Sequence, residues 1–73
     1  MKHEARDYEV RIWWSGRPGD ECYVAQVVEW PQIMAHGNTR EEAAHEIQAA
    51  LTLSLGDAAA HGVAVPQPRL AYA

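Results

Sequence analysis

The chain has 73 residues and a net charge of −4, which is enough for one domain with a small core. Six basic residues among ten acidic ones exclude the basic surface with which most nucleic-acid-binding domains hold phosphates. The lone cysteine, Cys22, excludes an intramolecular disulfide. We expect residues 1–73 to form a single domain, with a core over about 7–68 and a flexible tail over 69–73.

The chain contains no apolar run near the roughly 18 residues that span a bilayer. Its first residues also lack the apolar stretch of a signal peptide, so we expect a cytoplasmic protein that does not enter a membrane. A small core with no disulfide or zinc site to reinforce it gains stability from self-association. We therefore expect a homodimer or a tetramer.

Two strands and a hairpin are predicted at the start of the chain. Residues 7–15, DYEVRIWWS, alternate in the way typical of a half-buried strand, with Trp14 beside Ile12 in the core and Trp13 facing away. Residues 15–21, rich in Gly, Pro and Asp, predict a hairpin loop. Residues 21–30 are apolar on both faces, which predicts a central strand whose second face is covered as well, for example by another subunit.

A short third strand is expected at residues 32–37, after Pro31 has ended the second strand. The stretch Thr39 to Glu42 reads T-x-x-E, a capping box in which the Thr hydroxyl and the Glu carboxylate both accept hydrogen bonds from free backbone N–H groups. Gly37 permits the reversal from strand to helix, and Gly62 suits the position just past a helix end. A helix is thus predicted over residues 40–61.

The predicted helix has one face of apolar or small residues: Ala43, Ile47, Ala50, Leu51, Ser54, Leu55 and Ala58. The pair Gly56 and Asp57 disfavours helix, and the sequence leaves open whether it kinks or shortens this one. Residues 63–69, VAVPQPR, predict a short edge strand that two prolines stop. The predicted order is β-β-β-α-β, an α+β two-layer domain with a small sheet and one amphipathic helix packed on one face.

The segment YVAQVVEWPQIMAHGNTREEAAHEIQAAL resembles the HicB-like antitoxin family, whose consensus runs Y-x-A, P-E-L-P-G, a short strand, G-D-T-x-E-E-A and an amphipathic helix. The closing HGVAVPQP is similar to the family's end, and the resemblance covers about residues 8–68. Val28 stands where the family often has Pro, Gln32 where it often has Gly, and Asn38 where it usually has Asp. Asn still caps a helix entrance well.

This resemblance implies a partial RNase H-like fold and the role of antidote in a toxin–antitoxin pair. The family's partner is a small basic protein that cleaves mRNA with a histidine, and the antitoxin covers that site. Many members carry a further C-terminal DNA-binding domain, which these 73 residues do not include. Direct DNA binding is therefore not expected.

An RNase H-like fold also raises the possibility of a nuclease, because that chemistry places carboxylates around two metal ions. Asp7 and Glu9 share a predicted strand face, with Glu21 and Glu29 on the neighbouring strand, but alternating polar residues such as Gln26 are typical of an exposed sheet surface. The four histidines, at positions 3, 36, 45 and 61, lack the spacing of a helical metal site. We predict no catalytic or metal-ligating residue and no cofactor.

Large aromatic side chains on a polar face are enriched in protein interfaces. Trp13, Glu29, Trp30 and Met34 are accordingly the predicted association surface, with Asp7 and Glu9 adding acidic charge that would attract a basic partner. The sequence is interpreted as an antitoxin that sterically blocks a small basic HicA-like toxin. The alternatives are an orphan homo-oligomeric domain with a scaffold or ligand-sensing role and, third, a metal-dependent nuclease.

Overall fold

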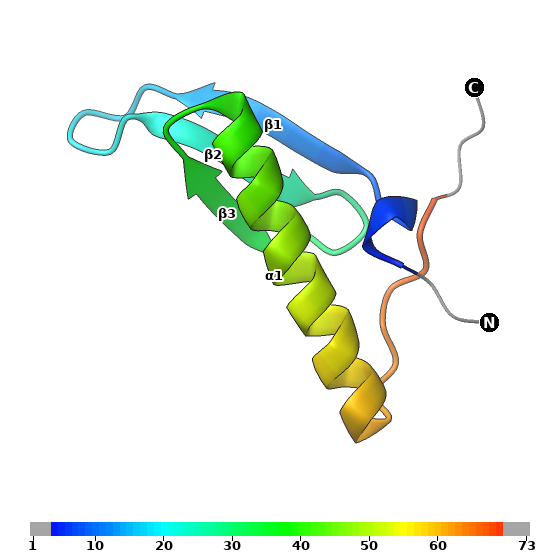
Figure 1. Cartoon of the computed structure of the whole chain (residues 1–73). Helices are drawn as coiled ribbons and strands as arrows, with labels where there is room; N and C mark the ends of the chain where they lie inside the picture. Colours follow the sequence, from blue (N-terminus) through cyan, green and yellow to red (C-terminus); the bar gives the residue numbers. More distant parts are fainter. Residues whose placement is uncertain (1–3, 70–73) are drawn as a thin grey trace.

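The computed structural model describes residues 4–69 and forms two layers, a three-stranded sheet and one long helix (Figure 1). A short 3-10 helix, η1 (Ala5–Asp7), leads into β1 (Val10–Ser15), β2 (Cys22–Val27), β3 (Met34–Gly37) and α1 (Arg40–His61). The sheet is antiparallel in the order β1-β2-β3, so β2 is central. The β-β-β-α part of the predicted order is confirmed.

The fourth predicted strand is wrong. Residues 63–69 are extended but pair with none of the three strands. Pro66 and Pro68 lack the N–H groups that a ladder needs, and the Pro66 carbonyl accepts instead the hydroxyl of Tyr8 at 2.7 Å. The segment is thus tied to the start of the chain by a side chain and not by strand pairing.

The strands are shorter than predicted at their outer ends. β1 begins at Val10 because residues 5–7 turn into η1, and β2 ends at Val27, well before Pro31. In the loop between β1 and β2, the Asp20 N–H donates to the Arg17 carbonyl at 2.9 Å, and Gly19 takes a φ of 84°. This left-handed position after Pro18 is typical of a type II turn.

The bounds of α1 match the prediction. The Glu42 N–H donates to Thr39 Oγ1 at 3.0 Å, and the Glu42 carboxylate accepts the N–H of Asn38, one residue earlier than a standard capping box would have it. Gly62 ends α1 with a φ of 64°, and the Val63 N–H bonds back to the Ala58 carbonyl. The helix runs unbroken through Gly56, which answers the question that the sequence left open.

Gly37 is needed for a different reason from the one predicted. Its backbone does not take a positive φ. A Cβ at this position would lie 2.6 Å from the Ala43 nitrogen and 2.9 Å from the Glu42 carbonyl carbon. The glycine therefore allows the end of β3 to approach the first turn of α1, where a side chain would push the two layers apart.

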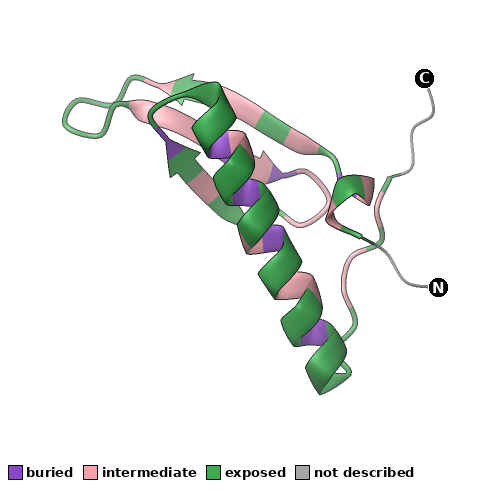
Figure 2. Cartoon of the chain, viewed as in Figure 1, coloured by how far each residue is buried: buried purple, intermediate pink, exposed green. Residues whose placement is uncertain are grey.

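The core lies between α1 and one face of the sheet, as the purple side of the helix in Figure 2 indicates. Ala25 and Val27 of β2 are fully buried against Ile47 and Leu51 of α1. Trp14 shares this face with Ile12 as predicted, but its predicted place in the core is wrong, because 52% of its surface is exposed. It lies near the hairpin and packs its edge against the Tyr23 ring.

Candidate functional site

The face of the sheet that points away from α1 has no cover among residues 4–69. Strand alternation and the pairing register assign eight side chains to it, and we call this surface the open face: Arg11, Trp13, Ser15, Cys22, Val24, Gln26, Met34 and His36. Sequence patterning predicted that both faces of β2 are covered. Within this chain α1 covers one of them, and cover of the second by another subunit stays a prediction.

Apolar and aromatic groups form the middle of the open face. Trp13 pairs with Val24 across the β1–β2 ladder, and Val24 pairs with His36 on β3. Met34 is the next residue of β3 on the same face as His36, and 51% of its surface is exposed. The Arg11 guanidinium lies 4.7 Å from the centre of the Trp13 ring, which is a cation–π contact.

A shallow hollow of about 380 Å³ marks the hairpin side of the open face. Cys22 and Val24 line it from β2, with Met34 and His36 from β3 and Arg17 from the hairpin. Its volume lies at the lower end of the range of small-molecule pockets, about 300–1,000 Å³. Such a mixed apolar and polar surface suits a protein side chain as well as a small ligand.

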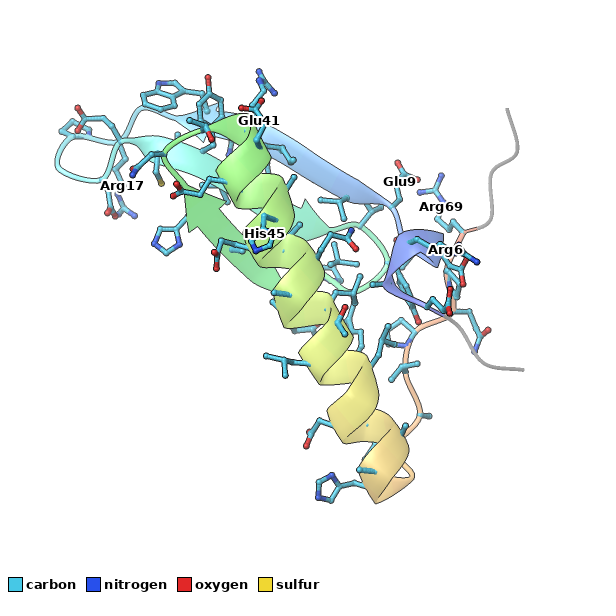
Figure 3. All side chains as sticks on the ribbon, in the orientation of Figure 1. Arg6, Glu9, Arg17, Glu41, His45 and Arg69 are labelled. Carbon is cyan, nitrogen blue, oxygen red and sulfur yellow. The ribbon has the colours of Figure 1, made fainter. Side chains whose placement is uncertain are left out.

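The predicted acidic residues gather at the other end of the sheet, and we call Asp7, Glu9 and Glu29 the acidic end. Glu29 Oε1 accepts the Glu9 N–H at 3.0 Å, and Glu29 Oε2 accepts the Arg69 N–H at 2.6 Å. In Figure 3, Glu9 lies near Arg69 at this end, far from Arg17 at the hairpin. The Glu29 side chain therefore joins β1, the loop after β2 and the C-terminal segment.

Tyr8 is the residue at this end that sequence reasoning missed. Its side chain is buried, and its hydroxyl donates to the Pro66 carbonyl. Burial raises the pKa of the Tyr8 hydroxyl above its ordinary value of 10.0, and the carboxylates of Glu29 and Asp7 raise it further. The alternation of residues 7–15 indicates that Tyr8 faces the core. No local sequence pattern could indicate its hydrogen bond, because Pro66 lies 58 residues away.

The predicted association residues fall into three groups. Trp13 and Met34 share the open face, while Asp7, Glu9 and Glu29 form the acidic end. Trp30 belongs to neither group, because it packs against the core from the loop after β2. That loop closes with the Ile33 N–H donating to the Trp30 carbonyl at 3.0 Å. The negative φ of Gln32 explains why this turn does not need the family's glycine.

The carboxylates weighed for a metal site do not converge. Asp7 lies in η1 and not on a strand, and Glu21 bonds the Gly19 N–H at the hairpin. Glu29 is at the opposite end of β2, which rises about 3.3 Å per residue. Among residues 4–69 no group of three His, Cys, Asp or Glu side chains is placed to hold a metal ion.

The histidines are also dispersed. His36 is on the open face, whereas His45 is exposed on the outer side of α1 (Figure 3). His61 contacts Asp57 near the C-terminus of α1, with 3.3 Å between Nδ1 and Oδ1. His3 lies outside the described residues. Cys22 is half-buried.

In the part of the chain that the structure describes, no helix is both long and apolar enough to cross a membrane. Comparison of the chain with protein-family models, curated protein sequences and solved structures finds no match. The relation to the HicB-like family therefore remains a prediction from the Y-x-A, G-N-T-x-E-E-A and P-x-P motifs. The function has to be argued from the open face and the acidic end.

Proposed function

We propose that this chain is a HicB-like antitoxin domain that binds a small basic, mRNA-cleaving toxin and blocks its active site by covering it. The observation that carries this proposal is the open face, where Trp13, Val24 and Met34 lie together on the side of the sheet that α1 does not cover. Exposed aromatic and Met side chains grouped on one surface are typical of protein interfaces.

Charge supports the proposal as well. The net charge of −4 and the acidic end favour encounter with a basic protein, chiefly by raising the association rate at low salt. Accepting backbone N–H groups does not cancel the charge of a carboxylate, so Asp7, Glu9 and Glu29 all contribute to this attraction. The apolar open face would then provide most of the affinity, as buried interface centres usually do.

The test is a binding and inhibition assay with the protein encoded next to this gene. The wild-type chain is expected to form a stable mixed complex by light scattering and to stop RNA cleavage by that protein. Met34→Asp, on the open face, should abolish both effects. Leu53→Asp is the matched control, because Leu53 is a similarly exposed apolar residue on α1, 75% exposed against 51% for Met34, and it should change neither.

If Met34→Asp binds and inhibits as the wild type does while Leu53→Asp does not, the open face is not the inhibitory surface. If neither the wild type nor the variants bind the neighbouring protein, the antitoxin proposal fails. The hollow beside Cys22 and His36 favours a second candidate function, an orphan homo-oligomeric domain that senses a small ligand. Ligand-induced shifts of the Val24 methyl NMR signals would support that function.

A further inference from the structure

We propose that the outer edge of β1 is a self-recognition site, at which β1 of a second copy pairs antiparallel about a two-fold axis centred on Ile12. The pairing joins two three-stranded sheets into one sheet of six strands. It requires β1 alone, so it holds whether or not the chain blocks a toxin.

The first argument is the direction of the backbone groups. The Val28 N–H donates to the Glu9 carbonyl at 2.8 Å, so Glu9 and Val28 form a hydrogen-bonded pair. Hydrogen-bonded pairs alternate along an antiparallel ladder. The continuous β1–β2 register therefore directs the N–H and C=O groups of Val10, Ile12 and Trp14 outward, to the side where no described strand lies.

The second argument is that, within residues 4–69, this edge has none of the usual protection against pairing. Natural edge strands are kept from pairing by Lys, Pro, bulges or shortness. β3, the other edge, has four residues, whereas β1 has six, VRIWWS, without Lys or Pro and with an unbroken register to β2. An edge of this kind is a template for another strand, and a second copy is always available to it.

The third argument is complementarity in the proposed register. A two-fold axis at Ile12 places Val10 opposite Trp14 of the second copy. The backbone N–H and C=O groups of both residues point away from β2, so the two residues can exchange hydrogen bonds. It also places Arg11 of each copy opposite Trp13 of the other, so the pair occurs twice on the open face. Arg11 already stacks on Trp13 within one chain at 4.7 Å, so the pairing extends this cation–π contact into a cluster of four side chains.

The available space fits the same arrangement. α1 packs most closely on β3 and least on β1, so two helices on the same side of the joined sheet stay apart (Figure 1). Antiparallel pairing also brings the hairpin of each copy toward the acidic end of the other. The hairpin carries Asp20 and Glu21 as well as Arg17, so its charges do not on balance attract the acidic end of the second copy.

A shape argument favours a second copy over an isolated chain. The radius of gyration is 13.1 Å, against about 11 Å for a compact domain of this length. The molecule measures 41 × 31 × 16 Å, a thin two-layer plate whose β1 edge adds exposed backbone to a small core. Pairing at β1 satisfies that backbone and lengthens the sheet without covering the open face.

The first experiment measures mass by light scattering for a matched pair of variants. Trp14→Pro removes an outward N–H that the β1–β2 ladder does not use, whereas Trp14→Ala removes the same side chain and keeps that N–H. The wild type and Trp14→Ala should have twice the chain mass of 8.1 kDa, and Trp14→Pro should have the mass of one chain with unchanged helical circular dichroism. A folded Trp14→Pro chain with the same mass as the wild type would overturn the proposal. A wild-type chain with the mass of one chain would overturn it as well, and the edge of β1 would then be free to bind an extended peptide of another protein.

A second experiment tests the register. In a Cys22→Ser background, chains with Arg11→Cys are mixed with chains with Trp13→Cys and oxidised. Directly opposed positions in a non-hydrogen-bonded pair have Cα atoms about 4.5 Å apart, within disulfide range, whereas diagonal positions are about 7–8 Å apart and fall outside it. Disulfide dimers should form in the mixture and not in either variant alone. Equal yields in the single-variant samples would overturn the proposed register.

Discussion

The two faces of the sheet have similar side chains but different surroundings. On the helix side, Ala25 and Val27 of β2 are fully buried against α1, while on the other side Val24 and Met34 remain accessible. An apolar residue on the first face stabilises the fold, and one on the second is available to a partner. The comparison teaches that apolar pattern alone does not separate a core from a binding surface, since β2 has both.

The largest expected effect is on the covered face. Leu51→Ala removes a fully buried side chain of α1 and should lower the free energy of unfolding by about 2–5 kcal/mol, because the cavity cannot collapse completely. Urea denaturation followed by circular dichroism measures the loss. An average substitution costs about 1 kcal/mol, so a smaller loss for Leu51→Ala would mean that this face does not stabilise the fold.

The contact between β3 and α1 should show the next largest effect. Gly37→Ala places a Cβ 2.6 Å from the Ala43 nitrogen, and the resulting shift of the two layers should cost about 1–3 kcal/mol. Gly56→Ala is the control, because nothing lies within 4 Å of its added Cβ. This exposed helical position should gain roughly 0.5–1 kcal/mol from better helix propensity. Destabilisation by both variants to the same extent would contradict the packing explanation.

The contact between Tyr8 and the C-terminal segment is smaller and depends on pH. Tyr8→Phe should cost about 1 kcal/mol near neutral pH, because the Pro66 carbonyl loses its hydrogen bond. In the wild type the folded-state pKa of Tyr8 lies above 10.0, so the folded state keeps its proton longer than the unfolded state does. The contribution is therefore complete below pH 10.0 and falls as pH rises through the folded-state pKa.

Thermal unfolding of the wild type and of Tyr8→Phe, measured from neutral pH to about pH 11, checks this prediction. The range ends about one pH unit above the ordinary pKa of tyrosine, which is about 10. The gap between the two proteins should narrow in the alkaline range. A constant gap would show that the hydroxyl does not titrate in the way its surroundings imply.

The smallest stability effect is expected on the open face. Met34→Ser should change the free energy of unfolding by no more than about 0.5 kcal/mol, as is usual for exposed positions, and should weaken binding to the proposed partner. Urea denaturation and light scattering of the mixed sample measure the two effects separately. A destabilisation comparable to that of Leu51→Ala would mean that a second copy covers this face and makes it part of the core.

Local signals explain what could be predicted from the sequence. Thr39, Glu42 and Gly62 act within one turn of the chain, so the bounds of α1 were predictable without knowing its surroundings. The spacing of Ile47 and Leu51 likewise predicts the buried side of the helix. These features depend on residues that are close in sequence.

Features that depend on distant residues could not be predicted. The exposure of Trp14 follows from how far α1 extends along β1, and the extended C-terminal segment follows from the Tyr8–Pro66 hydrogen bond. Glu29 was predicted as part of an interface, yet its carboxylate accepts backbone N–H groups 20 and 40 residues away. Residue type indicates an acidic surface, but only the fold shows which carboxylates are already engaged.

The most direct test of the central claim is oxidative footprinting of the chain, alone and mixed with the protein encoded next to its gene. Met34 and Leu53 are both exposed, one on the open face and one on the outer side of α1. The account predicts that Met34 and Trp13 become protected in the mixture while Leu53 stays reactive. Protection of Leu53 with unchanged reactivity at Met34 and Trp13 would contradict the claim that the open face binds the partner.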